Sequence, residues 1–199
     1  MIVTPIEHGI ELNKSAPGYV RSPGLHASAI YGDLYSALDP KRYGGTDGPN
    51  QGFMELGLAL EEGVEEALKR RWGFERPGEF VTHDGIIYTP DVFIFEKFEG
   101  EEALRVGEIK LTSMSSKGMP TVPSNGFPPK FDKWMCQLMF YAHELETNLG
   151  RLYTFFMLGD YGAHRSPELR AWDLEFSARA LQENAQMLRN HARHRGMLK

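Results

Sequence analysis

The chain has 199 residues, a size typical of one domain or of one domain with an appendage. Its single cysteine, Cys136, excludes an internal disulfide framework, a four-cysteine zinc site and a four-cysteine iron–sulfur cluster. No apolar run approaches the roughly 20 residues that span a bilayer, and no secretory signal pattern is visible, so we expect a cytoplasmic protein. The net charge of −5 argues against coating nucleic acid by bulk charge.

The first 52 residues are rich in glycine and proline, and we expect them to form an N-terminal extension of loops with a short helix at 25–38. Residues 53–199 then form the main domain. A strong helix is predicted over 53–73, because its apolar residues follow the 3.6-residue period and a glycine at its end can cap it.

The elements after this helix indicate a sheet with helices packed against it. Two strands, over 85–100 and 101–113, are joined by an acidic turn that contains glycine. After them we predict a helix, two strands and a C-terminal helix, over 130–150, 151–158, 170–177 and 177–196. This order predicts one mixed α/β domain.

Asp91, Glu108 and Lys110 are the most informative residues. Residues two apart in a strand share a face, so Glu108 and Lys110 point the same way as Val106, and Ile109 points to the opposite face. If the hairpin turns at residues 99–100, paired residues have numbers that sum to about 199, which places Asp91 beside Glu108.

Two carboxylates this close repel each other unless a cation lies between them, and hard oxygen ligands suit Mg²⁺ or Mn²⁺. A metal ion with a neighbouring lysine fits phosphodiester hydrolysis, because the ammonium can stabilise charge that develops on the phosphate. The alternative is an amphipathic hairpin with an ordinary solvated Glu–Lys pair. The strongly apolar strand around Glu108 and Lys110 favours a functional site.

Three further side chains on the predicted helices are candidates. Glu61 lies at the edge of the apolar stripe of the first helix. It is either a metal ligand or a partly exposed helix glutamate. Gln137 and Tyr141 are four residues apart on the second long helix, so their side chains are neighbours. They could contact phosphate or form a hydrogen bond on the helix surface.

Basic residues gather locally although the chain is acidic. Lys130 and Lys133 border the glycine- and proline-rich segment 112–130 and would touch phosphates if that loop covers the site. The groups at 69–71 and 189–199 are either solvated helix ends or contacts to DNA. A local positive rim around an acidic, metal-loaded centre is therefore compatible with a nucleic-acid partner.

Taken in order, four motifs resemble the RecB-type branch of the PD-(D/E)XK nuclease superfamily, which also contains lambda exonuclease-like nucleases. The motifs are LGLALEEGVEEAL with Glu61, TPD with Asp91, GEIK with Glu108 and Lys110, and QLMFY with Gln137 and Tyr141. The resemblance covers roughly residues 53–195 and implies a restriction-endonuclease-like fold, a mixed central sheet flanked by helices. The single cysteine excludes the iron–sulfur form of this family.

The resemblance also implies roles for these residues. Asp91, Glu108 and the main-chain carbonyl of Ile109 would bind Mg²⁺ or Mn²⁺, and Lys110 would assist the attacking water. Glu61 would take the position of the first motif as a further metal ligand. Gln137 and Tyr141 would contact DNA or support the site. Lys130 and Lys133 would add further contacts to DNA.

The function expected from this resemblance is that of a metal-dependent deoxyribonuclease, either an exonuclease or a recombination and repair nuclease, and family analogy favours a phage origin. Its partners would be DNA and a separate recombination or helicase chain, with no membrane. The alternative is a non-catalytic nucleic-acid-binding or assembly module that keeps the nuclease fold. The sequence leaves open exonuclease against endonuclease, DNA against RNA, and the oligomeric state.

Overall fold

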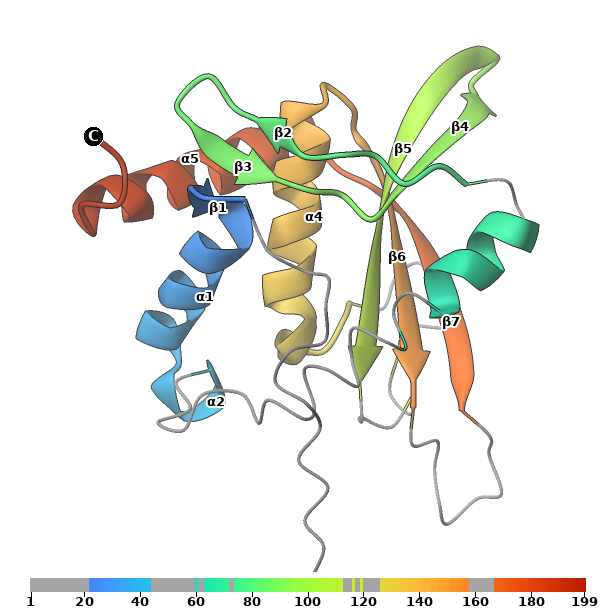
Figure 1. Cartoon of the computed structure of the whole chain (residues 1–199), viewed down its shortest axis with the longest axis horizontal. Helices are drawn as coiled ribbons and strands as arrows, with labels where there is room; N and C mark the ends of the chain where they lie inside the picture. Colours follow the sequence, from blue (N-terminus) through green and yellow to red (C-terminus); the bar gives the residue numbers. More distant parts are fainter. Residues whose placement is uncertain are drawn as a thin grey trace, which may run out of the picture.

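The computed structural model describes residues 22–43, 60, 63–71, 74–112, 116, 119, 126–157 and 167–199. A four-stranded sheet lies at its centre (Figure 1). Its strands, in spatial order, are β4 (Val92–Phe98), β5 (Glu101–Thr112), β6 (Leu149–Phe156) and β7 (Glu168–Glu175). The β5–β6 pair is parallel and the other two pairs are antiparallel, so the sheet is mixed as predicted.

A second, small sheet has the order β1-β3-β2 and contains β1 (Leu25–His26), β2 (Phe80–Val81) and β3 (Ile86–Tyr88). The prediction of one continuous strand over 85–100 is therefore wrong. Residues 89–91 separate β3 from β4, and β3 pairs with β1 and β2 instead of joining the larger sheet. Pro90 lies in this break and has no N–H to donate to a sheet.

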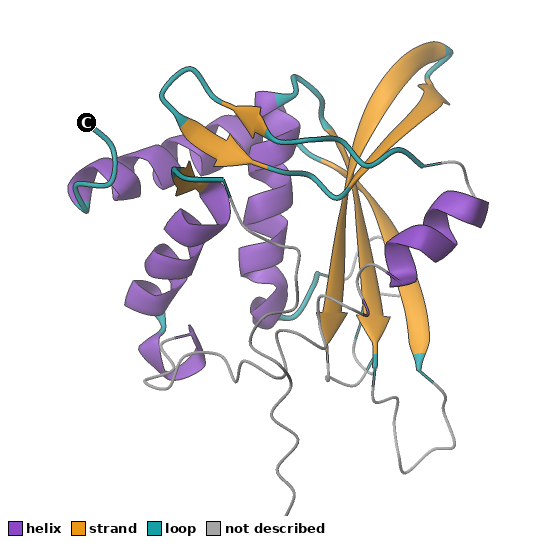
Figure 2. Cartoon of the chain, viewed as in Figure 1, coloured by secondary structure: helices purple, strands orange, loops and turns teal. Residues whose placement is uncertain are grey.

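Helices cover both faces of the central sheet (Figures 1 and 2). On one side, α4 packs against α1, α5, β5 and β6, while helical residues 63–71 lie on the other side. The bounds of the helices are α1 (Ala27–Leu38), α2 (Pro40–Tyr43), η1 (Pro129–Phe131), α4 (Asp132–Glu144) and α5 (Ala178–His194). Every helix among the described residues is too short or too polar to span a lipid bilayer.

The predicted helix over 130–150 extends too far. Helix α4 ends at Glu144, Glu146 has a positive φ of 55°, and β6 begins at Leu149, two residues before the predicted strand. A left-handed residue at this point turns the chain out of the helix. The predicted helix over 53–73 is confirmed where it is described, at 63–71, and the proposed domain boundary at residue 52 lies outside the described residues.

Alternation along the strands divides the apolar core into two clusters. Val106 of β5 and Leu152 of β6 belong to the larger cluster, which includes residues of α1, α4 and α5. Ile109 and Tyr153 point to the other face and pack with Leu68 of the 63–71 helix. Helix α1, expected in the N-terminal extension, contributes buried side chains to the larger cluster, so it stabilises the same core.

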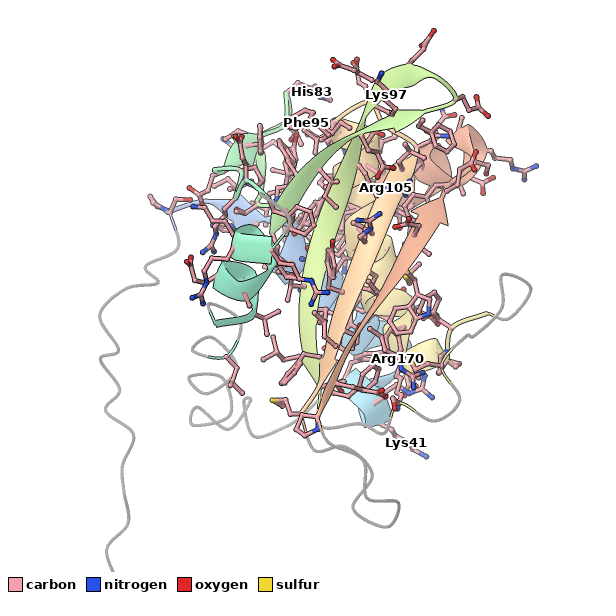
Figure 3. The ribbon with its side chains drawn as sticks, turned by 90° about the vertical axis from the view of Figure 1, so that its right-hand side faces the viewer. Lys41, His83, Phe95, Lys97, Arg105 and Arg170 are labelled. Carbon is pink, nitrogen blue, oxygen red and sulfur yellow. The ribbon has the colours of Figure 1, made fainter. Side chains whose placement is uncertain are left out.

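The face of the central sheet on the side of the 63–71 helix also carries a charged network (Figure 3). Arg105 of β5 is buried there, forms an ion pair with Glu96 of β4 and donates to the carbonyl oxygen of Gly150 at 3.0 Å. Arg151 and Asp173 extend the network across β6 and β7. Because Arg105 bonds to groups on both neighbouring strands, the network ties the two strands beside β5 to it.

Gly150 allows a test of the packing between α4 and the sheet. A Cβ at this position would lie 2.8 Å from Phe176 Cε2 and 3.2 Å from Leu138 Cδ2. We expect Gly150→Ala to lower the free energy of unfolding by about 1–3 kcal/mol in urea denaturation, because overpacking forces shifts in the core. Gly78→Ala is the control, since nothing lies within 4 Å of its Cβ position. Equal stability of the two variants would contradict this packing.

Candidate active site

The register of the β4–β5 hairpin places the site. Val92 pairs with Gly107 and Phe98 with Glu101, so partner numbers sum to 199, as predicted. Glu99 and Gly100 form the turn, with φ values of 52° and 91°. Two positive φ values suit a tight turn whose twist matches that of antiparallel strands. The next position along this register brings Asp91 beside Glu108.

Asp91 is held against β5 by two hydrogen bonds. Its backbone N–H donates to the carbonyl oxygen of Gly107 at 3.2 Å, and its Oδ2 accepts from the N–H of Ile109 at 2.6 Å. Gly107 permits the close approach of β4 to β5 at this point, because a Cβ at position 107 would lie 3.0 Å from Cβ of Val92, the residue after Asp91. The chain therefore fixes the direction of the Asp91 carboxyl group before any ligand binds.

Glu108 and Lys110 meet Asp91 at the same point. Glu108 is 1% exposed and forms an ion pair with Lys110, whose side chain is 22% exposed. The carboxyl group of Asp91 interacts with Glu108 and with the charge of Lys110. The three residues predicted to be catalytic thus lie together, on the face that the spacing in β5 predicts. Of the Glu108–Lys110 pair, the ammonium group of Lys110 is the more exposed to solvent.

The charges at this point are only partly balanced. Burial raises the pKa of the Asp91 carboxyl group, while Lys110, the Ile109 N–H and Arg76 oppose this rise by stabilising the ionised form. Two carboxyl groups in contact, with one lysine between them and solvent, favour the binding of a further cation. Their oxygen atoms are the donors that Mg²⁺ and Mn²⁺ prefer.

The donor set near Asp91 fits part of a metal site. Within the ranges that the structure describes, no group of three or more His, Cys, Asp or Glu side chains is placed to hold a metal ion. Asp91 and Glu108 with the carbonyl group of Ile109 would therefore supply only part of the coordination, with water or a further side chain completing it. Glu61, predicted for this role, lies outside the described residues.

Gln137 and Tyr141 form the wall of the site on the α4 side. Gln137 Nε2 donates to the Tyr141 hydroxyl at 2.6 Å, and both side chains are buried. The Tyr141 ring stacks on Tyr88 with centroids 5.8 Å apart. Burial raises the pKa of Tyr141 well above 10, and the charges of Glu108 and Asp91 add to this rise, so the hydroxyl lies near the carboxylates in its protonated form.

Lys130 and Lys133 lie at the start of α4, in η1 and in the first helical turn, and both are partly exposed. Figure 1 shows that this start of α4 and the carboxyl ends of β5 and β6 lie at the same end of the molecule. Their contact with DNA stays a prediction.

Two charged residues near Asp91 were missed from the sequence. Glu65 and Arg76 line a surface cavity of about 290 Å³ that also contains Asp91, and they form an ion pair at 3.0 Å. The side chain of Glu65 is only 14% exposed. Its place four residues after Glu61 was the available signal, whereas nothing in the sequence pattern singled out Arg76.

Comparison with known proteins supports the fold. An alkaline exonuclease from Laribacter hongkongensis, LHK-Exo, aligns with a TM-score of 0.50 and 15% identity over 86% of this chain and 87% of that chain. A second structure of LHK-Exo, in complex with dAMP, also matches, with 15% identity and a TM-score of 0.48. The structure of SSO0001 matches with 14% identity and a TM-score of 0.49. They cover 86% of this chain and 87% and 78% of their own chains.

No protein-family model matches the chain, and no curated protein matches it. At 15% identity the likeness to the alkaline exonuclease shows the fold alone. The predicted fold class, a mixed sheet flanked by helices, is confirmed, and this fold is one that an exonuclease also has.

The site makes a prediction about stability with opposite signs for two of its residues. In EDTA, Asp91→Asn should raise the free energy of unfolding, because it removes one of two repelling carboxylates while its side-chain oxygen still accepts from Ile109. Lys110→Met should lower the same quantity by about 2–4 kcal/mol, since it leaves buried Glu108 without its counter-charge. Urea denaturation measures both, and changes of the same sign would contradict the proposed balance of charges.

Proposed function

We propose that this protein is a divalent-metal-dependent nuclease that hydrolyses phosphodiester bonds of DNA. The observation that carries the proposal is the meeting of Asp91, Glu108 and Lys110 at one point of a mixed sheet, with Lys110 partly exposed. Two oxygen-donor carboxylates with an adjacent ammonium are suited to a reaction in which negative charge grows on a phosphate group.

Each residue has a separate task in this proposal. Asp91, Glu108 and the Ile109 carbonyl group would hold Mg²⁺ or Mn²⁺, with Glu61 as a further ligand. When bound, the ion supplies Lewis-acid polarisation of the phosphate and lowers the pKa of a water molecule. The N–H of Ile109 keeps the Asp91 carboxyl group directed at the site. The Lys110 ammonium orients the attacking water and stabilises the charge that develops on the phosphate.

The Gln137–Tyr141 pair keeps the α4 wall in place behind the carboxylates. Its hydrogen bond lies within the protein, so its main effect would be on the orientation of the groups that react. Lys130 and Lys133 would bind the DNA backbone at the open end of the site.

Among nucleases, we favour an exonuclease, because the chain shares its fold with an alkaline exonuclease. The ordered motifs support the RecB-type, lambda exonuclease-like branch. Family analogy alone favours a role in recombination or repair, a phage origin and a separate recombination or helicase partner. The intact set of Asp91, Glu108 and Lys110 favours an enzyme over a non-catalytic module with the same fold.

Cleavage of labelled linear and closed circular DNA of the same sequence tests the proposal. We expect mononucleotide release from linear DNA with Mn²⁺ or Mg²⁺, little cleavage of the circle, and none in EDTA. Asp91→Asn, Glu108→Gln and Lys110→Ala should each lower the rate by about a hundredfold or more.

The matched control is Lys97→Ala, which removes an exposed lysine from the neighbouring strand β4. Cleavage that survives EDTA, or a Lys110→Ala rate equal to that of Lys97→Ala, would refute the mechanism. Binding of DNA without cleavage in any metal would favour the non-catalytic alternative.

Removal of the Tyr141 hydroxyl tests the α4 wall. We expect Tyr141→Phe to lower kcat about tenfold or more and to leave KM nearly unchanged, because the hydroxyl is buried and bonds to Gln137. Steady-state kinetics on linear DNA with Tyr35→Phe as the control measures this, since the Tyr35 hydroxyl contacts Cys136 instead. A rise in KM with an unchanged kcat would instead assign Tyr141 to DNA binding.

A further inference from the structure

Arg76 is held beside the start of β4 by the backbone of its own segment. Glu75 lies at the edge of β4, where the N–H of Phe93 donates to the carbonyl oxygen of Glu75 at 3.0 Å. This bridge places Glu75, the residue before Arg76, opposite Phe93 of β4, which lies two residues after Asp91. The placement follows from the backbone and not from the arginine side chain itself.

The Arg76 side chain reaches the cavity that contains Asp91. Its Nη1 pairs with Glu65 Oε2 at 3.0 Å, yet the Arg76 side chain is 48% exposed while that of Glu65 is 14% exposed. An ion pair with one carboxylate engages only part of the five donors of a guanidinium group. A half-exposed pair of this kind adds little to stability, so stability alone gives no strong reason for an arginine here.

The charges around the cavity restrict what Arg76 can bind. Glu65, Glu66, Glu75 and Asp91 are acidic, and Lys69 is the other cation among the described lining residues. Arg76 and Lys69 are therefore the two described lining residues that attract an anion. A bound divalent cation at Asp91 would offset two of the acidic charges and make this approach easier.

We propose that Arg76, assisted by Lys69, binds the phosphate group of the nucleic acid adjacent to the one that is cleaved. The inference rests on the proposed nuclease function and adds a substrate-binding residue to that site. A guanidinium group beside Asp91 suits this role, because its planar donors match two phosphate oxygens.

The first test compares Arg76→Gln with Arg179→Gln. Arg179 is a suitable control because it pairs with a glutamate of its own helix, Glu183 of α5, and lies outside the residues that line the cavity. KM for cleavage of linear DNA in Mn²⁺, and Kd for a fluorescent oligonucleotide without divalent ions, are measured over a series of salt concentrations.

We expect Arg76→Gln to raise KM about tenfold or more and to reduce the slope of log KM against log salt by about one, with kcat nearly unchanged. Arg76→Lys should keep the salt slope and recover only part of the affinity, because an ammonium group cannot bind two oxygens in the same plane. Arg179→Gln should behave as the unmodified protein. Equal effects of Arg76→Gln and Arg179→Gln would overturn the inference.

A second test separates phosphate binding from support of Glu65. DNA with one methylphosphonate linkage next to the cleaved bond lacks the charge that Arg76 would bind, so it should raise KM for the unmodified protein and hardly at all for Arg76→Gln. If Glu65→Gln reproduces the loss while the salt slope of Arg76→Gln is unchanged, Arg76 acts through Glu65 and the proposal is wrong. Absence of cleavage by the unmodified protein would refute the nuclease function, while the Kd comparison would still decide on Arg76.

Discussion

The pairing register of the β4–β5 hairpin is the constraint on which the candidate site depends. A two-residue turn at Glu99 and Gly100 sets every pair along the two strands, down to Val92 and Gly107. A slip by one residue would turn the charged face of β5 into the apolar cluster under the 63–71 helix. Because the core on both faces opposes such a slip, packing far from Asp91 fixes where its carboxyl group lies.

Much of this arrangement could be predicted from the sequence, since it follows from local rules. Strand alternation places Glu108 with Val106 and separates both from Ile109, and the two apolar clusters confirm this division. The glycine in the acidic turn marks the centre of the hairpin, so arithmetic alone brings Asp91 to Glu108. The long helices follow from the helical period, although α4 ends six residues before the predicted limit.

Long-range pairing explains what the sequence did not reveal. The small sheet is built from two- and three-residue strands, and its β1–β3 pair joins residues about sixty positions apart. Strands this short carry almost no periodic signal. Arg76 reaches the cavity through one backbone bridge between Glu75 and Phe93. The pairing of Glu65 with Arg76 could not be predicted, because helical spacing gives the direction of a side chain and not the partner that covers it.

The proposed mechanism depends on Asp91 and Glu108 together holding a divalent ion. The most direct measurement is a titration with Mn²⁺ in which electron paramagnetic resonance detects the bound ion. We expect the unmodified protein to bind Mn²⁺, and we expect Glu108→Gln to weaken binding at least about tenfold. The control Glu102→Gln, which changes an exposed glutamate on the same face of β5, should bind as the unmodified protein does. Equal Mn²⁺ affinity of Glu108→Gln and Glu102→Gln would contradict the account.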